Sequence, residues 1–171
     1  MKTNRFPVRL MCENENAVVT PLPGGSFIQK LTEIVGQAKY SVDVVQYQWV
    51  WYPRDHDNLL QKFNRGVVGV AGRGVKFRVI LNIEASGHKI TRENSHTQRI
   101  LAEQKIHVKF GPQFPTTHSK IFIIDDQFVV IGSHNLSKRS VTVNYESSVL
   151  INSRAVAQEF KRYFETLWTS I

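Results

Sequence analysis

The sequence predicts a mixed α/β fold, in which a central mixed β-sheet is covered by helices on both faces. Stretches rich in β-branched and aromatic residues alternate with amphipathic helical stretches in the first half of the chain, as in strands joined by helices. Apolar runs joined by polar turns follow, which indicates antiparallel strands in the same sheet. With 171 residues, 42% of them apolar, we expect one domain over residues 1–171.

The expected elements follow one another along the chain. Residues 17–27 predict a short strand and a Pro/Gly turn, and Ser26 is expected to cap a helix that runs to about Lys39. Further helices are expected at 58–74, ending at Gly72 or Gly74, at 94–104, and at 153–171 with Ser153 as the cap. Further strands are expected at 40–49, 75–83, 106–110 and 143–151, with a hairpin over 118–132 that turns at 125–127.

The charge and the cysteine content limit the possible functions. Lys and Arg number 22 against 14 Asp and Glu, and this formal charge of +8 favours nucleic acid or an acidic membrane surface as partner. The single cysteine, Cys12, excludes a disulfide framework and a cysteine-based zinc site, and it suits a reducing compartment. Neither a signal peptide nor a run of about 18 apolar residues is apparent, so we expect a cytoplasmic protein without stable membrane insertion, unless the chain was cut from a longer one.

A polar cluster is expected at the open end of the hairpin. Side chains of a strand alternate between its faces, so His118 and Lys120 point the same way, whereas Ser119 faces the other side. Ser133 and Asn135 also share a parity, and hairpin pairing would bring them beside His118 and Lys120. Asn135 is also a candidate cap for the short helical turn that follows it.

These residue types suit a phosphoryl group. Lysine and asparagine can hold and neutralise its oxygens, and histidine can attack phosphorus or move protons. Fixed cationic and amide donors would take the electrostatic role of Mg²⁺, so we expect neither a metal nor another cofactor. The other histidines show no ligand spacing that supports a metal site: His56, His88, His96 and His107.

The spacing of the cluster resembles the HKD motif of the phospholipase D superfamily. The matching positions are His118, Lys120, Asp125, Gly132, Ser133 and Asn135. Over roughly residues 18–165, including the stretch 21–47, the chain is similar to the small endonucleases of this superfamily that carry one motif, bacterial Nuc among them. The resemblance implies the phospholipase D/nuclease-like fold, and it places a glutamate that orients the histidine at Glu146.

The resemblance also implies a two-step mechanism and a dimer. One histidine would attack the phosphodiester to form a phosphohistidine, and a histidine from a second motif would protonate the leaving oxygen and later activate water. Because this chain has one motif, two chains would supply the two copies, most simply in a homodimer with the active site on its two-fold axis. His118 would then act as nucleophile in one copy and as general acid in the other.

Other positions of the motif have supporting roles. Asp125 lies at a turn and is expected to be structural, and Gly132 is expected to allow a particular backbone conformation or a close approach. Ser133 can donate a hydrogen bond to the phosphate or to Glu146. His134 lies between two motif residues, and we expect it to point away into solvent.

Candidate nucleic-acid contacts lie outside the motif. Trp49 and Trp51 share a strand face with Tyr47 and could stack on unpaired bases, although packing in the core or in a dimer interface is the favoured alternative. Lys138 and Arg139, shortly after Asn135, are the best candidates for contacts with backbone phosphates.

The sequence thus favours a metal-independent phosphodiesterase that acts on nucleic acid, with DNA as the expected substrate and RNA as the other choice. One alternative is a phospholipase D-type enzyme that acts on a phospholipid such as cardiolipin, because the charge also suits anionic membranes. The second alternative is a nucleic-acid-binding module that does not cleave.

Overall fold

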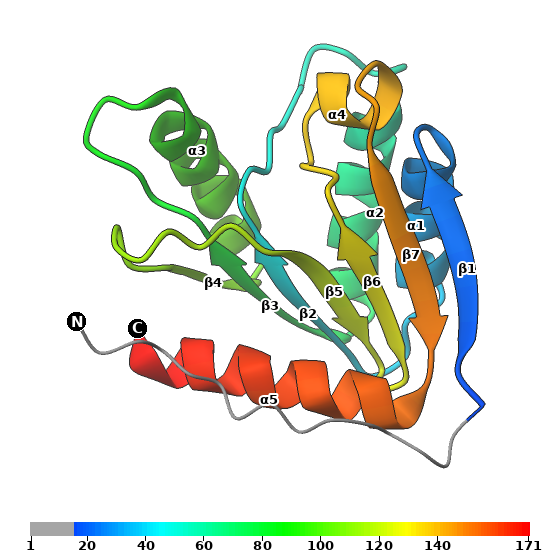
Figure 1. Ribbon diagram of the computed structural model, residues 1–171. Helices are drawn as coiled ribbons and strands as arrows, with labels where there is room; N and C mark the ends of the chain where they lie inside the picture. Colours follow the sequence, from blue (N-terminus) through cyan, green and yellow to red (C-terminus); the bar gives the residue numbers. More distant parts are fainter. Residues whose placement is uncertain (1–15) are drawn as a thin grey trace.

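The computed structural model describes residues 16–171, so Cys12 and the N-terminal stretch lie outside the described part. Seven strands form one sheet in the order β1-β7-β6-β5-β2-β3-β4 (Figure 1). The strands are β1 (Val18–Pro23), β2 (Ser41–Gln46), β3 (Lys76–Leu81), β4 (His107–Phe110), β5 (Lys120–Ile124), β6 (Phe128–Gly132) and β7 (Ser147–Asn152). The helices are α1 (Ser26–Gly36), α2 (Leu59–Gly72), α3 (Lys89–Glu103), α4 (Lys138–Thr142) and α5 (Arg154–Ser170).

The sheet is mixed, as expected. β2, β3 and β4 are parallel and are joined by α2 and α3, whereas β5, β6, β7 and β1 follow in antiparallel pairs. β5 lies antiparallel beside β2, and this pairing joins the two halves of the sheet. The carboxyl end of β2 therefore lies beside the start of β5, which is where the polar cluster of the sequence begins.

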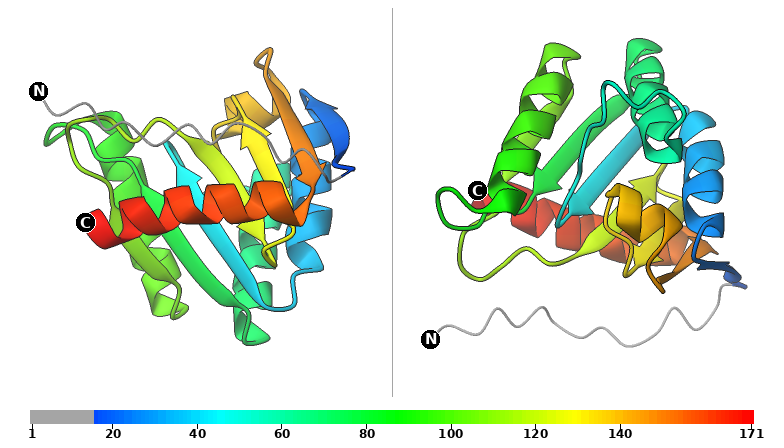
Figure 2. Two further views of the ribbon diagram at one scale, coloured as in Figure 1. Left: turned by 60° about the horizontal axis from the view of Figure 1, so that its bottom comes forward. Right: turned by 90° about the horizontal axis from the view of Figure 1, so that it is seen from above.

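Helices cover both faces of the sheet, which confirms the predicted fold class. On one face α1, α2 and α3 pack over the larger apolar core, and α5 crosses the other face (Figures 1 and 2). The larger core includes Leu31, Phe63, Leu101 and Phe122. The smaller core beneath α5 includes Ile80, Ile123, Val129 and Phe164. Consecutive residues of β5 thus enter opposite cores, as the period of two requires.

The start of α1 differs from the prediction. Gly25 occupies the N-cap position, and Ser26 is the first helical residue, so the expected cap at Ser26 is wrong. The Ser26 hydroxyl instead donates a hydrogen bond to the carbonyl of Pro23 (2.7 Å), within the turn that precedes the helix. The helix ends at Gly36, three residues before Lys39.

Other boundaries agree to different degrees. Ser153 caps α5, because its hydroxyl accepts a hydrogen bond from the amide of Val156 (3.3 Å) as predicted. The strand expected over 40–49 ends at Gln46, and α3 begins at Lys89, five residues before the expected start. Within residues 16–171, no helix is both long and apolar enough to cross a membrane.

Asp125 links the hairpin turn to the segment that leads from α1 into β2. Its backbone adopts a left-handed conformation (φ 53°), and its carboxylate accepts hydrogen bonds from the amides of Lys39, Tyr40 and Ser41 at 2.8–2.9 Å. The turn lies at the end of β5 opposite the start where His118 and Lys120 are found. The contacts of Asp125 are thus those of a structural residue.

We expect Asp125→Ala to lower the free energy of unfolding by about 2 kcal/mol more than Asp126→Ala, because it removes three charge-assisted hydrogen bonds. Asp126 is a matched control, since it is also left-handed (φ 51°) but makes a surface ion pair with Lys161. Urea denaturation of both variants measures the difference. Equal losses would show that the three amide contacts contribute no more to stability than the ion pair of Asp126 with Lys161.

Candidate active site

His118 and Lys120 form the first half of the candidate site, at the open edge of the sheet. Lys120 begins β5 and pairs with Gln46, the last residue of β2. The ammonium of Lys120 donates to the carbonyl oxygen of His118 (2.7 Å) and lies 3.4 Å from each ring nitrogen of that histidine. Ser119 contacts the hydroxyl of Tyr163 on α5, so it faces the opposite side of the sheet, as predicted. The His118 side chain itself is exposed.

Tyr47 and Glu84 accompany this pair and were not singled out as catalytic from the sequence. The ring of Tyr47 lies 4.6 Å from that of His118, and the Lys120 ammonium lies 5.0 Å from the Tyr47 ring centre. Burial raises the pKa of Tyr47, as do the charge of Glu84 and a hydrogen bond to it. Asn82 holds Glu84 through a hydrogen bond of 2.7 Å. Both residues follow parallel strands, Tyr47 after β2 and Glu84 after β3, and polar residues at such carboxyl ends were the available signal.

In the proposed chemistry, His118 must be neutral to act as a nucleophile, whereas Lys120 must be charged to bind an anion. Burial lowers the pKa of His118, and the charge of Lys120 lowers it further, while Glu84 partly opposes both effects. Burial lowers the pKa of Lys120 to about 8, while the charge of Glu146 acts against this effect. At neutral pH the site therefore combines a neutral imidazole, which can act as a nucleophile or base, with a charged ammonium.

Ser133 and Glu146 form a second group beside the first. The hydroxyl of Ser133 donates to the carboxylate of Glu146 (2.5 Å), as do the Ser140 hydroxyl (2.9 Å) and the Asn144 amide (3.2 Å). Burial raises the pKa of Glu146, but these three hydrogen bonds outweigh it, so the pKa is lowered and the carboxylate is ionised. Among residues 16–171 of one chain, Glu146 makes no hydrogen bond to His118; Glu84 is the carboxylate whose charge acts on that ring.

Asn135 lies next to Ser133 on the same segment. This segment continues from β6 and runs beside the segment after β2, where Leu136 bridges to Trp49 and donates to the carbonyl of Gln48 (2.9 Å). The amide oxygen of Asn135 is buried and has no hydrogen-bond partner in the described part of the chain. Ser137, not Asn135, occupies the N-cap of α4, so the expected capping role of Asn135 is wrong.

Gly132 allows a close approach of β6 to β7. A Cβ atom at this position would lie 2.1 Å from the hydroxyl of Ser148 and 2.4 Å from the carbonyl oxygen of Ser147, too close for any side chain. Of the two explanations offered for this glycine, close approach agrees with the structure. The absence of a side chain lets Ser133 reach Glu146 from the end of β6.

His134 is buried, which corrects the expected exposed position. Its ring stacks on Phe27 at 4.1 Å, its Nε2 donates to the carbonyl of Gly24 (3.1 Å), and its Nδ1 accepts from the hydroxyl of Ser148 (2.7 Å). Burial lowers the pKa of His134, so the ring is neutral. The alternation of faces correctly predicted that His134 points away from the site. It is buried and not exposed because the β1–α1 turn covers the side that it faces.

The two tryptophans differ in exposure. Trp49 is fully buried in the larger core, and its indole donates to Asn64 (2.8 Å), so core packing is correct for Trp49 and base stacking is not. Trp51 is half-buried and contacts the edge of that core, beside an apolar hollow lined by residues 51–55. Only Trp51 of the two retains surface on which a base could stack.

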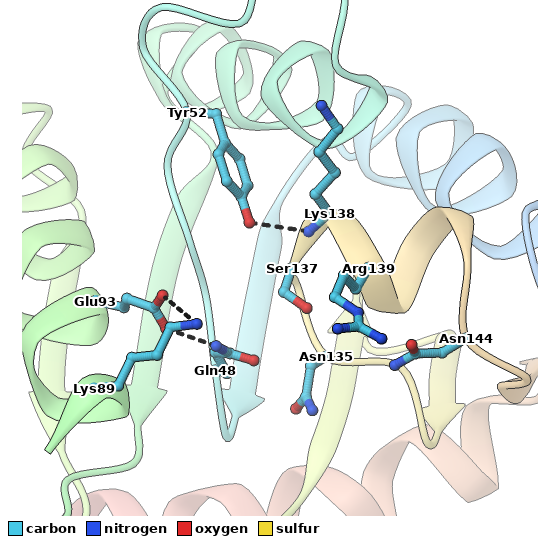
Figure 3. A pocket seen from close by; sticks show the side chains of 9 residues that line it. All are labelled: Gln48, Tyr52, Lys89, Glu93, Asn135, Ser137, Lys138, Arg139 and Asn144. Atoms are coloured by element: carbon cyan, nitrogen blue, oxygen red, sulfur yellow. Dashed lines mark hydrogen bonds and ion pairs between the residues drawn. The ribbon is translucent and has the colours of Figure 1, made fainter.

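A polar pocket of about 350 Å³ opens beside Asn135 (Figure 3). Its lining residues come from the segment after β2, from α3 and from the region around α4: Gln48, Tyr52, Lys89, Glu93, Asn135, Ser137, Lys138, Arg139 and Asn144. Both basic candidates for phosphate contacts, Lys138 and Arg139, thus belong to this pocket. Within residues 16–171, no group of three or more His, Cys, Asp or Glu side chains is arranged to hold a metal ion.

The arrangement brings a neutral imidazole, an ammonium and an amide to one edge of the sheet. Such a set can bind an anion and supply a nucleophile to it. A family model described as cardiolipin synthase, PLD-like domain, matches residues 31–168, and the chain therefore belongs to the phospholipase D-like domain family.

Two solved structures share the fold of this chain, and a curated protein is similar to it in sequence. The phospholipase D family member Nuc from Salmonella typhimurium matches with a TM-score of 0.75 and 22% identity over 90% of this chain and 95% of its own. NucT from Helicobacter pylori matches with a TM-score of 0.73 and 21% identity over 90% and 97%. The 5'-3' exonuclease PLD3 of Xenopus tropicalis is 24% identical over 165 residues, which is 90% of this chain but 31% of that relative. The chain thus spans about a third of the length of this curated relative.

Proposed function

We propose that this protein is a metal-independent phosphodiesterase that cleaves nucleic acid, with DNA as its expected substrate, in a site shared by two copies of the chain. The observation that carries this proposal is the pairing of His118 with the Lys120 ammonium, next to Asn135, in a chain of the phospholipase D-like family. The similar protein PLD3 is named a 5'-3' exonuclease, which supports a nucleic-acid substrate.

In the first step, the neutral imidazole of His118 attacks the phosphorus atom and a P–N bond forms. The P–O bond to the leaving group breaks, and the protonated His118 of the second copy gives its proton to the leaving oxygen. In the second step that imidazole, now neutral, takes a proton from water, whose oxygen attacks phosphorus and releases the first histidine. A free phosphate monoester results, and the two histidines titrate as a coupled pair.

The other residues stabilise charge and hold the groups in place. Lys120 and Asn135 bind the non-bridging oxygens, on which charge develops during each step. Asn135 has an amide that is not otherwise engaged, since its buried oxygen lacks a partner in residues 16–171 and a half-turn of the amide would present the NH₂ donors instead. Glu146 holds Ser133, and we assign to Glu146 the orientation of a histidine at the interface.

We assign three exposed apolar residues beside this site to an interface with the second copy. Phe114, Val143 and Tyr145 are large apolar residues that are 69–108% exposed. Phe114 lies in the segment that leads into His118, and the other two precede Glu146. Exposed apolar side chains at the rim of a half-site support an interface between copies.

Cleavage assays test the proposal against its two alternatives. Labelled single- and double-stranded DNA and RNA are incubated with the protein in EDTA, and vesicles containing phosphatidylglycerol and cardiolipin are tested in parallel. We expect cleavage of nucleic acid, no turnover of the lipids, and no cleavage by His118→Ala. Turnover of lipid alone would favour the phospholipase, which the description of the matching family model suggests. Binding of nucleic acid without cleavage would favour a binding module.

Activity should fall on the alkaline side with an apparent pKa near 8. Burial lowers the pKa of Lys120 to about 8, so the free protein loses this ammonium as the pH rises through that value. The value of kcat/KM reports ionisation of the free protein, and it should decline there. In Lys120→Arg the charge persists at all pH values, so the decline near pH 8 should be lost, and only the decline that follows deprotonation of the general-acid histidine should remain. An unchanged alkaline limb in this variant would assign the titration to another group.

A further inference from the structure

The polar pocket beside Asn135 has an unequal charge distribution, because its ionic groups are engaged to different extents. Glu93 accepts a hydrogen bond from Gln48 (2.6 Å) and lies 3.7 Å from the Lys89 ammonium, so its charge is compensated within the pocket wall. The Lys138 ammonium forms an ion pair with Asp55 (2.8 Å) and points away from the pocket in Figure 3.

Arg139 is the cation that is left for a ligand. Its side chain is exposed, and it makes no ion pair with any residue of the described range 16–171. The backbone amide of Asn144 donates to the carbonyl of Arg139 (2.9 Å), and both residues line the pocket together with Asn135 (Figure 3). An arginine fork beside two amides offers several donors to an anionic group; one N–H of Asn144 is used by Glu146 (3.2 Å), and its other N–H remains for a ligand.

The neighbouring site limits what this anion can be. Asn135 belongs both to the candidate active site and to the lining of the pocket, so a ligand in the pocket is adjacent to the phosphate that is cleaved. The volume of about 350 Å³ is near the lower limit for small-ligand sites, and among the described residues that line it Tyr52 alone is aromatic or aliphatic. This lining suits a phosphate and its sugar, whereas an acyl chain would require an apolar wall.

We propose that this pocket binds the nucleotide next to the scissile phosphate, with Arg139 gripping the phosphate group of that nucleotide and Asn144 donating to it. The proposal rests on the proposed function, since it takes the ligand to be a nucleic-acid strand. The proposal gives the two adjacent basic residues different roles. Arg139 binds the ligand, whereas Lys138 holds α4 against the loop around Asp55 through an ion pair.

Binding of a fluorescent single-stranded oligonucleotide tests the pocket without requiring cleavage. Anisotropy titrations are made in a His118→Ala background with Arg139→Ala, and with Arg99→Ala as the matched control. Arg99 is an exposed arginine on α3, so both variants lose one positive charge from the surface. We expect Arg139→Ala to raise Kd about tenfold. We also expect it to reduce the slope of log K against log salt by about 0.7, the value for one phosphate contact on a single strand. Arg99→Ala should change Kd less than twofold, and Lys138→Ala less than threefold.

Kinetics with His118 intact then separates the pocket from the active site. Bis(4-nitrophenyl) phosphate has one phosphate, and an oligonucleotide has several, so the ratio of their kcat/KM values isolates contacts beyond the scissile group. Arg139→Ala should lower the oligonucleotide-to-small-diester ratio about tenfold, mainly through KM. Two results would overturn the proposal. An equal loss of kcat/KM on both substrates would place Arg139 in the active site. Equal Kd values for the Arg139→Ala and Arg99→Ala variants would show that Arg139 does not contact the oligonucleotide.

The test also distinguishes this inference from the proposed function. If the unmodified protein cleaves nucleic acid but Arg139→Ala binds it as tightly as the control does, the proposed role of the pocket is wrong and the proposed function stands. If the protein binds nucleic acid through Arg139 and does not cleave it, the pocket stands and the function fails. Arg139-dependent binding to vesicles of phosphatidylglycerol, without binding to the oligonucleotide, would overturn both.

Discussion

Replacing His118 by alanine is expected to lower the rate of phosphodiester cleavage by about 10³-fold or more, because it removes the nucleophile and the general acid together. The side chain is exposed and contacts Tyr47 and Lys120, so its loss leaves no cavity in the core. The variant should therefore unfold at the same urea concentration as the unmodified protein. Single-turnover assays on a labelled oligonucleotide measure the rate.

His107→Ala is a suitable control for this experiment. His107 is also exposed, but it lies on β4 at the edge of the sheet, away from the start of β5. This control should keep full activity. If His118→Ala cleaved as fast as His107→Ala, the proposed nucleophile would be wrong, whatever the substrate.

Replacing Lys120 by alanine should lower kcat/KM by about 10²- to 10³-fold, as expected when one preorganised charged donor to a reacting phosphate is lost. The Lys120 ammonium donates to the His118 carbonyl and lies beside the His118 ring, so the substitution also removes a positive charge next to the ring. The pKa of His118 should rise slightly, because the charge of Lys120 contributes to its lowering. The acid limb of the pH profile of the residual activity should therefore shift to higher pH.

Lys62→Ala controls for the loss of one positive charge. Lys62 is exposed on α2 and lines none of the pockets described above. Because it removes the same charge at another place, any effect of long-range attraction on substrate binding is common to both variants. A loss of activity in Lys120→Ala no larger than in Lys62→Ala would show that Lys120 does not contact the reacting phosphate.

The alternation of side chains along β5 was enough to predict half of the site. His118 and Lys120 lie on the face away from α5, while Ser119 contacts Tyr163 on α5, in agreement with the period of two. The mixed sheet with helices on both faces was predictable for a similar reason, since apolar period and turn residues determine strand and helix positions locally. The family resemblance pointed to Glu146, and of the two partners considered for Ser133 the structure shows a hydrogen bond to Glu146.

Residues that depend on distant segments could not be placed in this way. His134 is buried because the β1–α1 turn, more than a hundred residues earlier, supplies Gly24 and Phe27 as its partners. For Trp49 the favoured expectation of core packing is correct, but the residue lies beyond β2, which ends at Gln46, and not on the expected strand. Tyr47 and Glu84 meet His118 only because β2, β3 and β5 become neighbours in the sheet. Contacts between such distant residues follow from the order of the strands in the sheet, which the periodicity of the sequence alone does not specify.

The need for two copies of the motif can be measured by mixing subunits. Unmodified protein and His118→Ala are unfolded together in varying proportions, refolded, and assayed at a fixed total concentration on a labelled oligonucleotide. If one site requires a histidine from each chain, mixed dimers are inactive, and activity falls as the square of the unmodified fraction, to about one quarter at equal amounts. A linear fall, to about one half at equal amounts, would show that each chain has a complete site and would contradict the shared site.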